Sequence, residues 1–214
     1  MIEREFGPIR VSVQGSGRVG ALVIADTADV AQLADAFPRM PLASVACADW
    51  DRNLTPWPAA IGGRQFSGEG EACLSTLIGC ALPWLEEQTG ARKWQIAGYS
   101  LGGLFALWAA LCTDAFVGAA SVSGSMWYPG FLAWMGGARH SPARAYLSVG
   151  AREKRSRNPA FATIEQDTRR AVEQLGRIGV QTQWEINPGG HFQDPVGRMR
   201  RALQWLLDEA GKEA

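Results

Sequence analysis

Short apolar runs alternate with amphipathic segments along most of the chain, and this alternation predicts strands and helices in turn. Apolar and β-branched runs predict strands at residues 9–13, 20–24, 42–48, 94–98, 117–122, 145–149 and 180–186. Apolar positions at helical spacing predict helices at residues 29–37, 67–88, 102–111, 159–175 and 195–207. The run at 42–48 is almost entirely apolar, which is typical of a strand buried on both faces.

The order of these elements predicts an α/β fold. Gly15-Ser16-Gly17 separates the first two strands and indicates a hairpin turn, so residues 9–13 and 20–24 are expected to pair antiparallel. Repeated strand–helix units follow and predict a mostly parallel sheet with helices on both faces. Pro83 is expected to kink or divide the helix at 67–88.

No repeat, low-complexity segment or linker divides the sequence, so residues 1–214 are expected to form a single domain. The composition, with 47% hydrophobic and 20% charged residues, is ordinary for a globular protein. Only about one helix fits between the predicted strands that end at 122 and begin at 145. We therefore expect no large lid domain.

Charge and hydropathy narrow the range of partners. The 21 basic and 21 acidic side chains give a formal net charge of zero, which predicts neither nucleic acid nor an anionic membrane as partner. No apolar window is long enough for membrane insertion, and the charged N-terminal residues do not resemble a signal peptide. A cytoplasmic location is the resulting expectation.

The four cysteines indicate free thiols. Cys73 and Cys80 are two helical turns apart, roughly 10 Å, which is too far for a disulfide. The sequence contains no Cys-x-x-Cys and only two histidines, so it has few ligands for zinc. We expect no metal and no organic cofactor.

Gly98-Tyr99-Ser100-Leu101-Gly102 fits the G-x-S-x-G pattern of a nucleophile elbow. The pattern requires a strand before it and a helix after it, and the predicted elements at 94–98 and 102–111 supply both. A serine in such a tight turn adopts a strained backbone, and side chains at the flanking glycines would collide. Ser100 is therefore the predicted nucleophile, and the N–H of Leu101 is a predicted oxyanion donor.

A serine nucleophile needs a base, and the two histidines are His140 and His191. His191 follows the last predicted strand and precedes the last helix, where an α/β-hydrolase carries its base, so it is the predicted general base. His140 precedes a strand and is expected to lie in a surface loop near the opposite edge of the sheet.

The third member of a triad is expected to be a carboxylate at the end of a strand between Ser100 and His191. Glu153 follows the predicted strand at 145–149, although the basic residues around it also suit a solvated charge run. Asp194 is an alternative acid that could instead cap the last helix, because Pro195 follows it. A Ser–His dyad is a third alternative.

Four blocks resemble the putative-esterase branch of the α/β-hydrolases, which includes esterase D-like and enterochelin-esterase-like enzymes. The blocks lie at residues 50–58, 98–106, 121–128 and 189–192, with the sequences WDRNLTPWP, GYSLGGLFA, SVSGSMWY and GGHF. The resemblance implies an α/β-hydrolase fold with Ser100 and His191 as catalytic residues and Glu153 at the position of the acid.

The loops after the predicted strands supply the remaining candidates. Trp50 follows the strand at 42–48 and is the candidate for the second oxyanion N–H, with Asp49 and Asp51 beside it. Four large side chains are candidates to line an acyl or aromatic pocket, or else to pack against the helices: Trp57, Met126, Trp127 and Tyr128.

Together these residues predict an enzyme that hydrolyses a small-molecule carboxylic ester or thioester through an acyl-enzyme on Ser100. Two alternatives remain open at this stage. One is acyl transfer to an acceptor other than water on the same fold, and the other is a non-catalytic α/β-hydrolase-like binding module.

Overall fold

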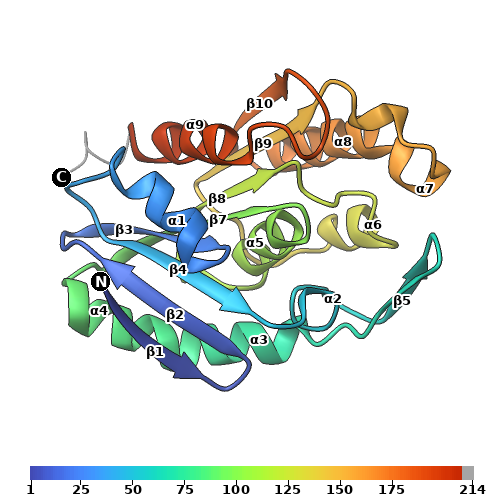
Figure 1. Ribbon diagram of the computed structural model, residues 1–214. Coiled ribbons are helices and arrows are strands. Elements are labelled where there is room, and N and C mark those ends of the chain that lie inside the picture. Colours follow the sequence, from blue (N-terminus) through green and yellow to red (C-terminus); the bar gives the residue numbers. More distant parts are fainter. Residues whose placement is uncertain (209–214) are drawn as a thin grey trace.

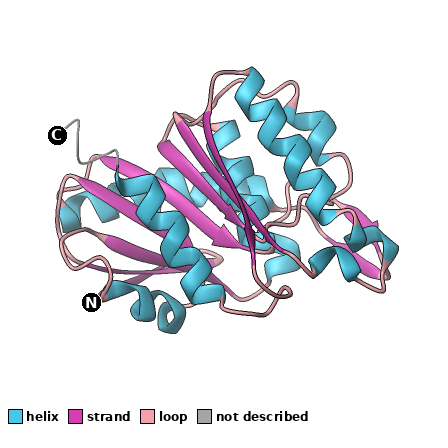
Figure 2. Cartoon of the chain, turned by 90° about the horizontal axis from the view of Figure 1, so that it is seen from above, coloured by secondary structure: helices cyan, strands magenta, loops and turns pink. Residues whose placement is uncertain are grey.

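The computed structural model describes residues 1–208, which form an eight-stranded sheet flanked by helices (Figure 1 and Figure 2). The first two pairs of neighbouring strands are antiparallel and all later pairs are parallel. The order across the sheet is β1 (Ile2–Phe6), β2 (Ile9–Gln14), β4 (Leu42–Cys47), β3 (Val19–Ile24), β7 (Lys93–Tyr99), β8 (Phe116–Val122), β9 (Arg144–Gly150) and β10 (Gln181–Asn187). The predicted architecture, a mostly parallel sheet with an antiparallel N-terminal hairpin, is confirmed.

The position predicted for that hairpin is wrong. β2 and β3 do not pair, because β4 lies between them, antiparallel to β2 and parallel to β3. The hairpin is formed instead by β1 and β2. β1 was not predicted because three consecutive charged residues, Glu3 to Glu5, interrupt any apolar pattern and are exposed at the edge of the sheet. Gly15 has another role: a Cβ there would lie 2.4 Å from the carbonyl oxygen of Met40.

Helices cover both faces of the sheet, as predicted. α1 (Thr27–Ala34) and α9 (Pro195–Asp208) pack on one face. The other face carries α3 (Gly70–Thr76), α4 (Leu82–Thr89), α5 (Leu101–Cys112), α6 (Phe131–Met135) and α8 (Ile164–Arg177). Each helix buries an apolar side against the strands, so the sheet holds the core on both sides.

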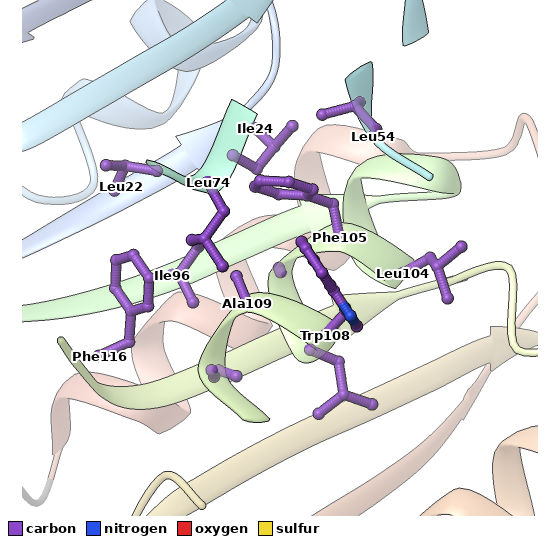
Figure 3. Packing of buried hydrophobic residues seen from close by; sticks show 14 of the residues in the cluster. Leu22, Ile24, Leu54, Leu74, Ile96, Leu104, Phe105, Trp108, Ala109 and Phe116 are labelled. Atoms are coloured by element: carbon purple, nitrogen blue, oxygen red, sulfur yellow. The ribbon is translucent and has the colours of Figure 1, made fainter. Parts of the chain in front are cut away.

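The larger of the two cores surrounds α5. This helix is apolar on every side, which is typical of a helix buried within a domain. Figure 3 shows Phe105 and Trp108 of α5 among side chains from β3, β7 and α3. Phe105 is completely buried, and this packing fixes the start of α5, where Ser100 precedes the helix.

The helix predicted at 67–88 is divided before Pro83. α3 runs into a π-helical turn (Leu77–Ala81), in which the N–H of Leu82 bonds to the carbonyl of Leu77, and α4 follows directly. Pro83 is the second residue of α4, so the irregular π-helical turn directly precedes the position at which the proline removes an N–H from the helix. The helix predicted at 159–175 is also divided, into α7 (Pro159–Ala162) and α8.

Small elements surround the carboxyl ends of the parallel strands. They are α2 (Trp50–Asn53), the hairpin of β5 (Ala59–Ile61) and β6 (Arg64–Phe66), and a 3₁₀ turn (Glu153–Arg155). Only α6 lies between β8 and β9. Residues 1–208 therefore contain no large lid domain, as predicted.

Candidate active site

Ser100 occupies the tight turn between β7 and α5. Its backbone has φ 56° and ψ −119°, a conformation rarely adopted by residues other than glycine. The neighbouring glycines are required by close packing, since a Cβ on Gly98 would lie 2.1 Å from the carbonyl oxygen of Gly102. The turn therefore needs the small residues of the G-x-S-x-G pattern, and it presents Ser100 at the carboxyl end of the strand.

Three side chains from distant parts of the sequence meet at this point. Oγ of Ser100 lies 3.1 Å from Nε2 of His191, and Nδ1 of His191 lies 2.7 Å from Oε2 of Glu153. Both distances are within hydrogen-bonding range. Because the Glu153 carboxylate accepts a hydrogen bond from Nδ1, the neutral imidazole carries its hydrogen on that nitrogen. Nε2 is then free to accept a hydrogen bond from the Ser100 hydroxyl.

The second oxygen of Glu153 is held by three donors. Oε1 accepts the N–H of Gly150 at 2.6 Å, the hydroxyl of Ser123 at 2.9 Å and a guanidinium N–H of Arg198 at 3.2 Å. Burial alone would raise the pKa of Glu153, but its hydrogen bonds, chiefly that with His191, hold it below its ordinary value. Glu153 is therefore charged at neutral pH although its side chain is only 5% exposed.

The other candidates for acid and base lie elsewhere. Asp194 is exposed and caps α9, because Oδ1 accepts the N–H of Gly197 at 3.1 Å. His140 is exposed in the loop before β9. Of the two histidines and two carboxylates considered, the structure brings His191 and Glu153 together at Ser100.

Leu101 and Trp50 are the first residues of α5 and α2. The N–H groups in the first turn of a helix have no intrahelical acceptor and carry the positive end of the helix dipole. Leu101 directly follows Ser100, and α2 contacts α5. The two residues considered as oxyanion donors are therefore both the first residue of a helix.

A cavity of about 380 Å³ lies beside Ser100 and His191. Its apolar wall consists of Trp127, Phe161, Ile164 and Phe192, and its polar lining consists of Arg64, Ser123, Glu153 and Ser156. Such a mixture of an apolar wall and a few polar groups is typical of a small-molecule site.

Of the four large side chains considered for the pocket, Trp127 lines this cavity. Met126 and Tyr128 are almost completely buried, and the hydroxyl of Tyr128 donates to the carbonyl of Trp57. Trp57 donates its Nε1–H to the carbonyl of Pro129 at 2.9 Å and lines a different hollow. Of the two alternatives given for these side chains, packing therefore fits Met126 and Tyr128, which are buried, whereas Trp57 is half-buried and does not line the cavity beside Ser100.

Two residues of this region were not predicted from the sequence. Tyr99 donates its hydroxyl to the carbonyl of His191 at 2.5 Å, and Arg198 is fully buried beside Glu153. The sequence did contain a signal for the burial of Arg198. At helical spacing, Arg198 falls on the same side of α9 as Ala202 and Leu206, which are buried. Charge on an otherwise apolar side of a helix indicates a buried partner.

The described residues contain no group of three or more His, Cys, Asp or Glu side chains able to hold a metal ion. Within the same part of the chain, no helix combines the length and the apolarity needed to cross a bilayer.

The model of the family described as "Putative esterase" matches residues 67–194, more than half of the chain. A search of curated proteins finds no match. Among solved structures, the siderophore hydrolase EstA from Aspergillus nidulans is similar, with 16% identity and a TM-score of 0.68, over 94% of this chain and 90% of that one. An IroE-like serine hydrolase from Shewanella oneidensis has 14% identity and a TM-score of 0.73, over 94% of this chain and 75% of that one.

The enterobactin esterase FES from Shigella flexneri, solved in the presence of enterobactin, has 20% identity and a TM-score of 0.75. The match covers 98% of this chain but 58% of that one, so this chain spans less than two thirds of that protein. At these identities the likeness establishes the fold, and the predicted α/β-hydrolase fold is confirmed.

Proposed function

The chain belongs to the putative esterase family and is an ester-hydrolysing enzyme, and we propose that it cleaves small-molecule carboxylic esters through an acyl-enzyme on Ser100. The observation that carries this proposal is the continuous series of hydrogen-bonding distances from Ser100 through His191 to Glu153. This order of nucleophile, base and carboxylate is the arrangement that activates a serine hydroxyl.

In the first step, His191 accepts the proton of the Ser100 hydroxyl at Nε2 while Oγ attacks the carbonyl carbon of the ester. The charged Glu153 stabilises the imidazolium that forms. When the tetrahedral intermediate collapses, His191 gives the proton to the leaving alkoxide, and the alcohol departs. Water then attacks the acyl-enzyme with His191 as base again, which releases the acid and restores Ser100.

The amides of Leu101 and Trp50 are our proposed donors to the oxyanion. Backbone N–H groups at helix N-termini are fixed before the reaction, so they stabilise the developing charge without reorganising. The loss of one such donor typically costs on the order of 10²-fold to 10³-fold in kcat.

Water is the acyl acceptor favoured by the cavity. The side chain of His191 is itself 30% exposed at the cavity, so solvent reaches the base. An acyltransferase must protect its acyl-enzyme from water. The strained backbone of Ser100, which costs on the order of 1–3 kcal/mol, also favours an enzyme over a binding module that would not need it.

The test is covalent labelling with a fluorophosphonate probe, which reacts with an activated serine. We expect the wild-type chain to be labelled and the Ser100→Ala variant to remain unlabelled. Ser125, which is buried, provides a matched Ser→Ala control that should label like the wild type. Absence of labelling in the wild type, or equal labelling of Ser100→Ala, contradicts the proposal.

A further inference from the structure

Arg198 is a buried cation in contact with the candidate acid, Glu153, and with the loop that carries the candidate base. Arg198 is the fourth residue of α9 and is fully buried. A charge removed from water is costly unless it is paired and hydrogen-bonded. The five acceptors around its guanidinium group are therefore informative about its role.

One nitrogen of the guanidinium group faces the acid. Nη1 lies 3.2 Å from Oε1 of Glu153 and 2.9 Å from Oγ of Ser123, which itself donates to the same carboxylate oxygen. Arg198 thus binds the oxygen of Glu153 that His191 does not use. The carboxylate is fixed in rotation, with Oε2 directed to the imidazole.

The second terminal nitrogen of the guanidinium group, Nη2, faces the loop that carries the base. Nη2 donates to the carbonyl oxygens of Pro188 at 2.8 Å and Gly190 at 2.9 Å. Nη1 also lies 3.2 Å from the hydroxyl of Tyr99, which donates in turn to the carbonyl of His191. Arg198 therefore connects the acid with the backbone of two residues in the loop of the base directly, and with that of His191 through Tyr99.

The surrounding backbone is shaped around these contacts. A Cβ at Gly150 would lie 2.8 Å from Oε1 of Glu153 and 3.0 Å from Nη2 of Arg198. Glycine at the end of β9 thus leaves the space in which the acid and the guanidinium group meet.

Stability alone does not explain a buried ion pair, because well-packed apolar side chains are often equally stabilising in its place. Precise placement of catalytic groups does explain it, since a displacement of about 1 Å can cost on the order of 100-fold in rate.

We propose that Arg198 is a positioning residue that holds Glu153 and the loop of His191 in register for catalysis. The inference rests on the proposed function of Ser100, His191 and Glu153. Arg198 itself touches neither the nucleophile nor, by this proposal, the substrate. Its effect on the reaction passes through the orientation of the imidazole.

The test compares Arg198→Met with the wild type in hydrolysis of a p-nitrophenyl ester. We expect kcat to fall about 100-fold while KM changes less than threefold, because the cavity beside Ser100 is unchanged. Arg144→Met is the matched control: Arg144 is also bound to α9, through the carbonyl of Leu206 and the ring of Trp205, at the other end of β9. This control should keep wild-type kcat.

A double-mutant cycle separates positioning from general stabilisation. In a Glu153→Gln background, Arg198→Met should lower kcat by clearly less than its 100-fold effect in the wild type, because the carboxylate, one of the two groups that it positions, is already lost. Independent effects that multiply, or a folded Arg198→Met variant with kcat within threefold of the wild type, overturn the proposal.

If Arg198→Met does not fold, Arg198→Lys serves the same purpose. Lysine keeps the charge but lacks the fork that reaches Glu153 and two carbonyls together, so kcat should fall about tenfold; wild-type kcat overturns the proposal.

Fluorophosphonate labelling of wild-type Ser100 distinguishes failure of the proposed function from failure of the inference about Arg198. If the wild type is not labelled, the proposed function is wrong, whereas labelling with an unchanged Arg198 variant rejects this inference alone.

Discussion

Two hollows of the molecule have aromatic walls, and each contains one of the two histidines. The cavity beside Ser100, of about 380 Å³, contains His191. The second, of about 550 Å³, lies near α5 and α6 and contains His140 with Cys112. We call the second one the tryptophan hollow, because its wall includes Trp57, Trp108 and Trp134.

The two hollows differ in how their polar groups are arranged. In the Ser100 cavity, both ring nitrogens of His191 have partners, and the carboxylate on one side is itself held by buried donors. In the tryptophan hollow, His140 is exposed, and burial raises the pKa of the Cys112 thiol to about 11. That thiol is neutral at physiological pH and is a weak nucleophile.

On the proposed function, volume, aromatic lining and the presence of a histidine are therefore not sufficient for catalysis. The larger hollow has all three, together with a thiol. What distinguishes the Ser100 cavity is the convergence of fixed polar groups on one reactive atom. The predictions below test this distinction by making matched changes in the two hollows.

Replacement of the two histidines is expected to give the largest difference. His191→Ala removes the base and should lower kcat for a p-nitrophenyl ester by about 10⁶-fold, since a triad without its base loses nearly all of its rate enhancement. His140→Ala should leave kcat within twofold of the wild type. Comparable losses in both variants, with both chains folded by circular dichroism, would place a functional role in the tryptophan hollow.

Replacement of the carboxylate is expected to give the next largest effect. Glu153→Gln should lower kcat by about 10⁴-fold, because the amide can donate to Nδ1 and thereby favour the wrong tautomer of His191. The matched variant is Asp194→Asn, which retains a side-chain oxygen to cap α9. It should keep kcat within a few-fold; the opposite ranking of the two variants would assign the acid to Asp194.

Much of this site was predictable because its sequence signals are local. The G-x-S-x-G pattern, its strand and its helix identify Ser100 within a dozen residues, and His191 follows from its place after the last strand. The position of Glu153 also follows a strand end. The structure places these three side chains within hydrogen-bonding distance of one another.

The signals that failed depend on neighbours distant in sequence. Periodicity showed that residues 9–13 and 20–24 are strands but could not show that β4 lies between them. The sequence could not decide which residues after β8 line a pocket and which pack: Trp127 lines the cavity, whereas Met126 and Tyr128 are directed into the core. Arg198 was not predicted because charged residues on a helix are usually exposed, and its partners come from four other parts of the chain.

The smallest expected effect concerns the aromatic walls themselves. Trp127 contacts Phe161 in the wall of the Ser100 cavity, with ring centroids 4.5 Å apart, whereas Trp134 stacks on Phe131 at 5.9 Å beside the tryptophan hollow. Trp127→Leu should raise KM for a p-nitrophenyl ester several-fold, up to about tenfold (~1.4 kcal/mol), with little change in kcat, because it removes ring contacts made equally in the ground and transition states.

Trp134→Leu is the matched change. Trp127→Leu and Trp134→Leu should lower the melting temperature of the protein by similar amounts, since both rings are half-buried and pack against other aromatic side chains. Its KM should equal that of the wild type. Equal shifts in KM for the two variants would mean that the substrate extends into both hollows, and the distinction drawn between them would then apply to the reactive groups but not to binding. A shift confined to Trp127→Leu would instead restrict both recognition and chemistry to the cavity at Ser100.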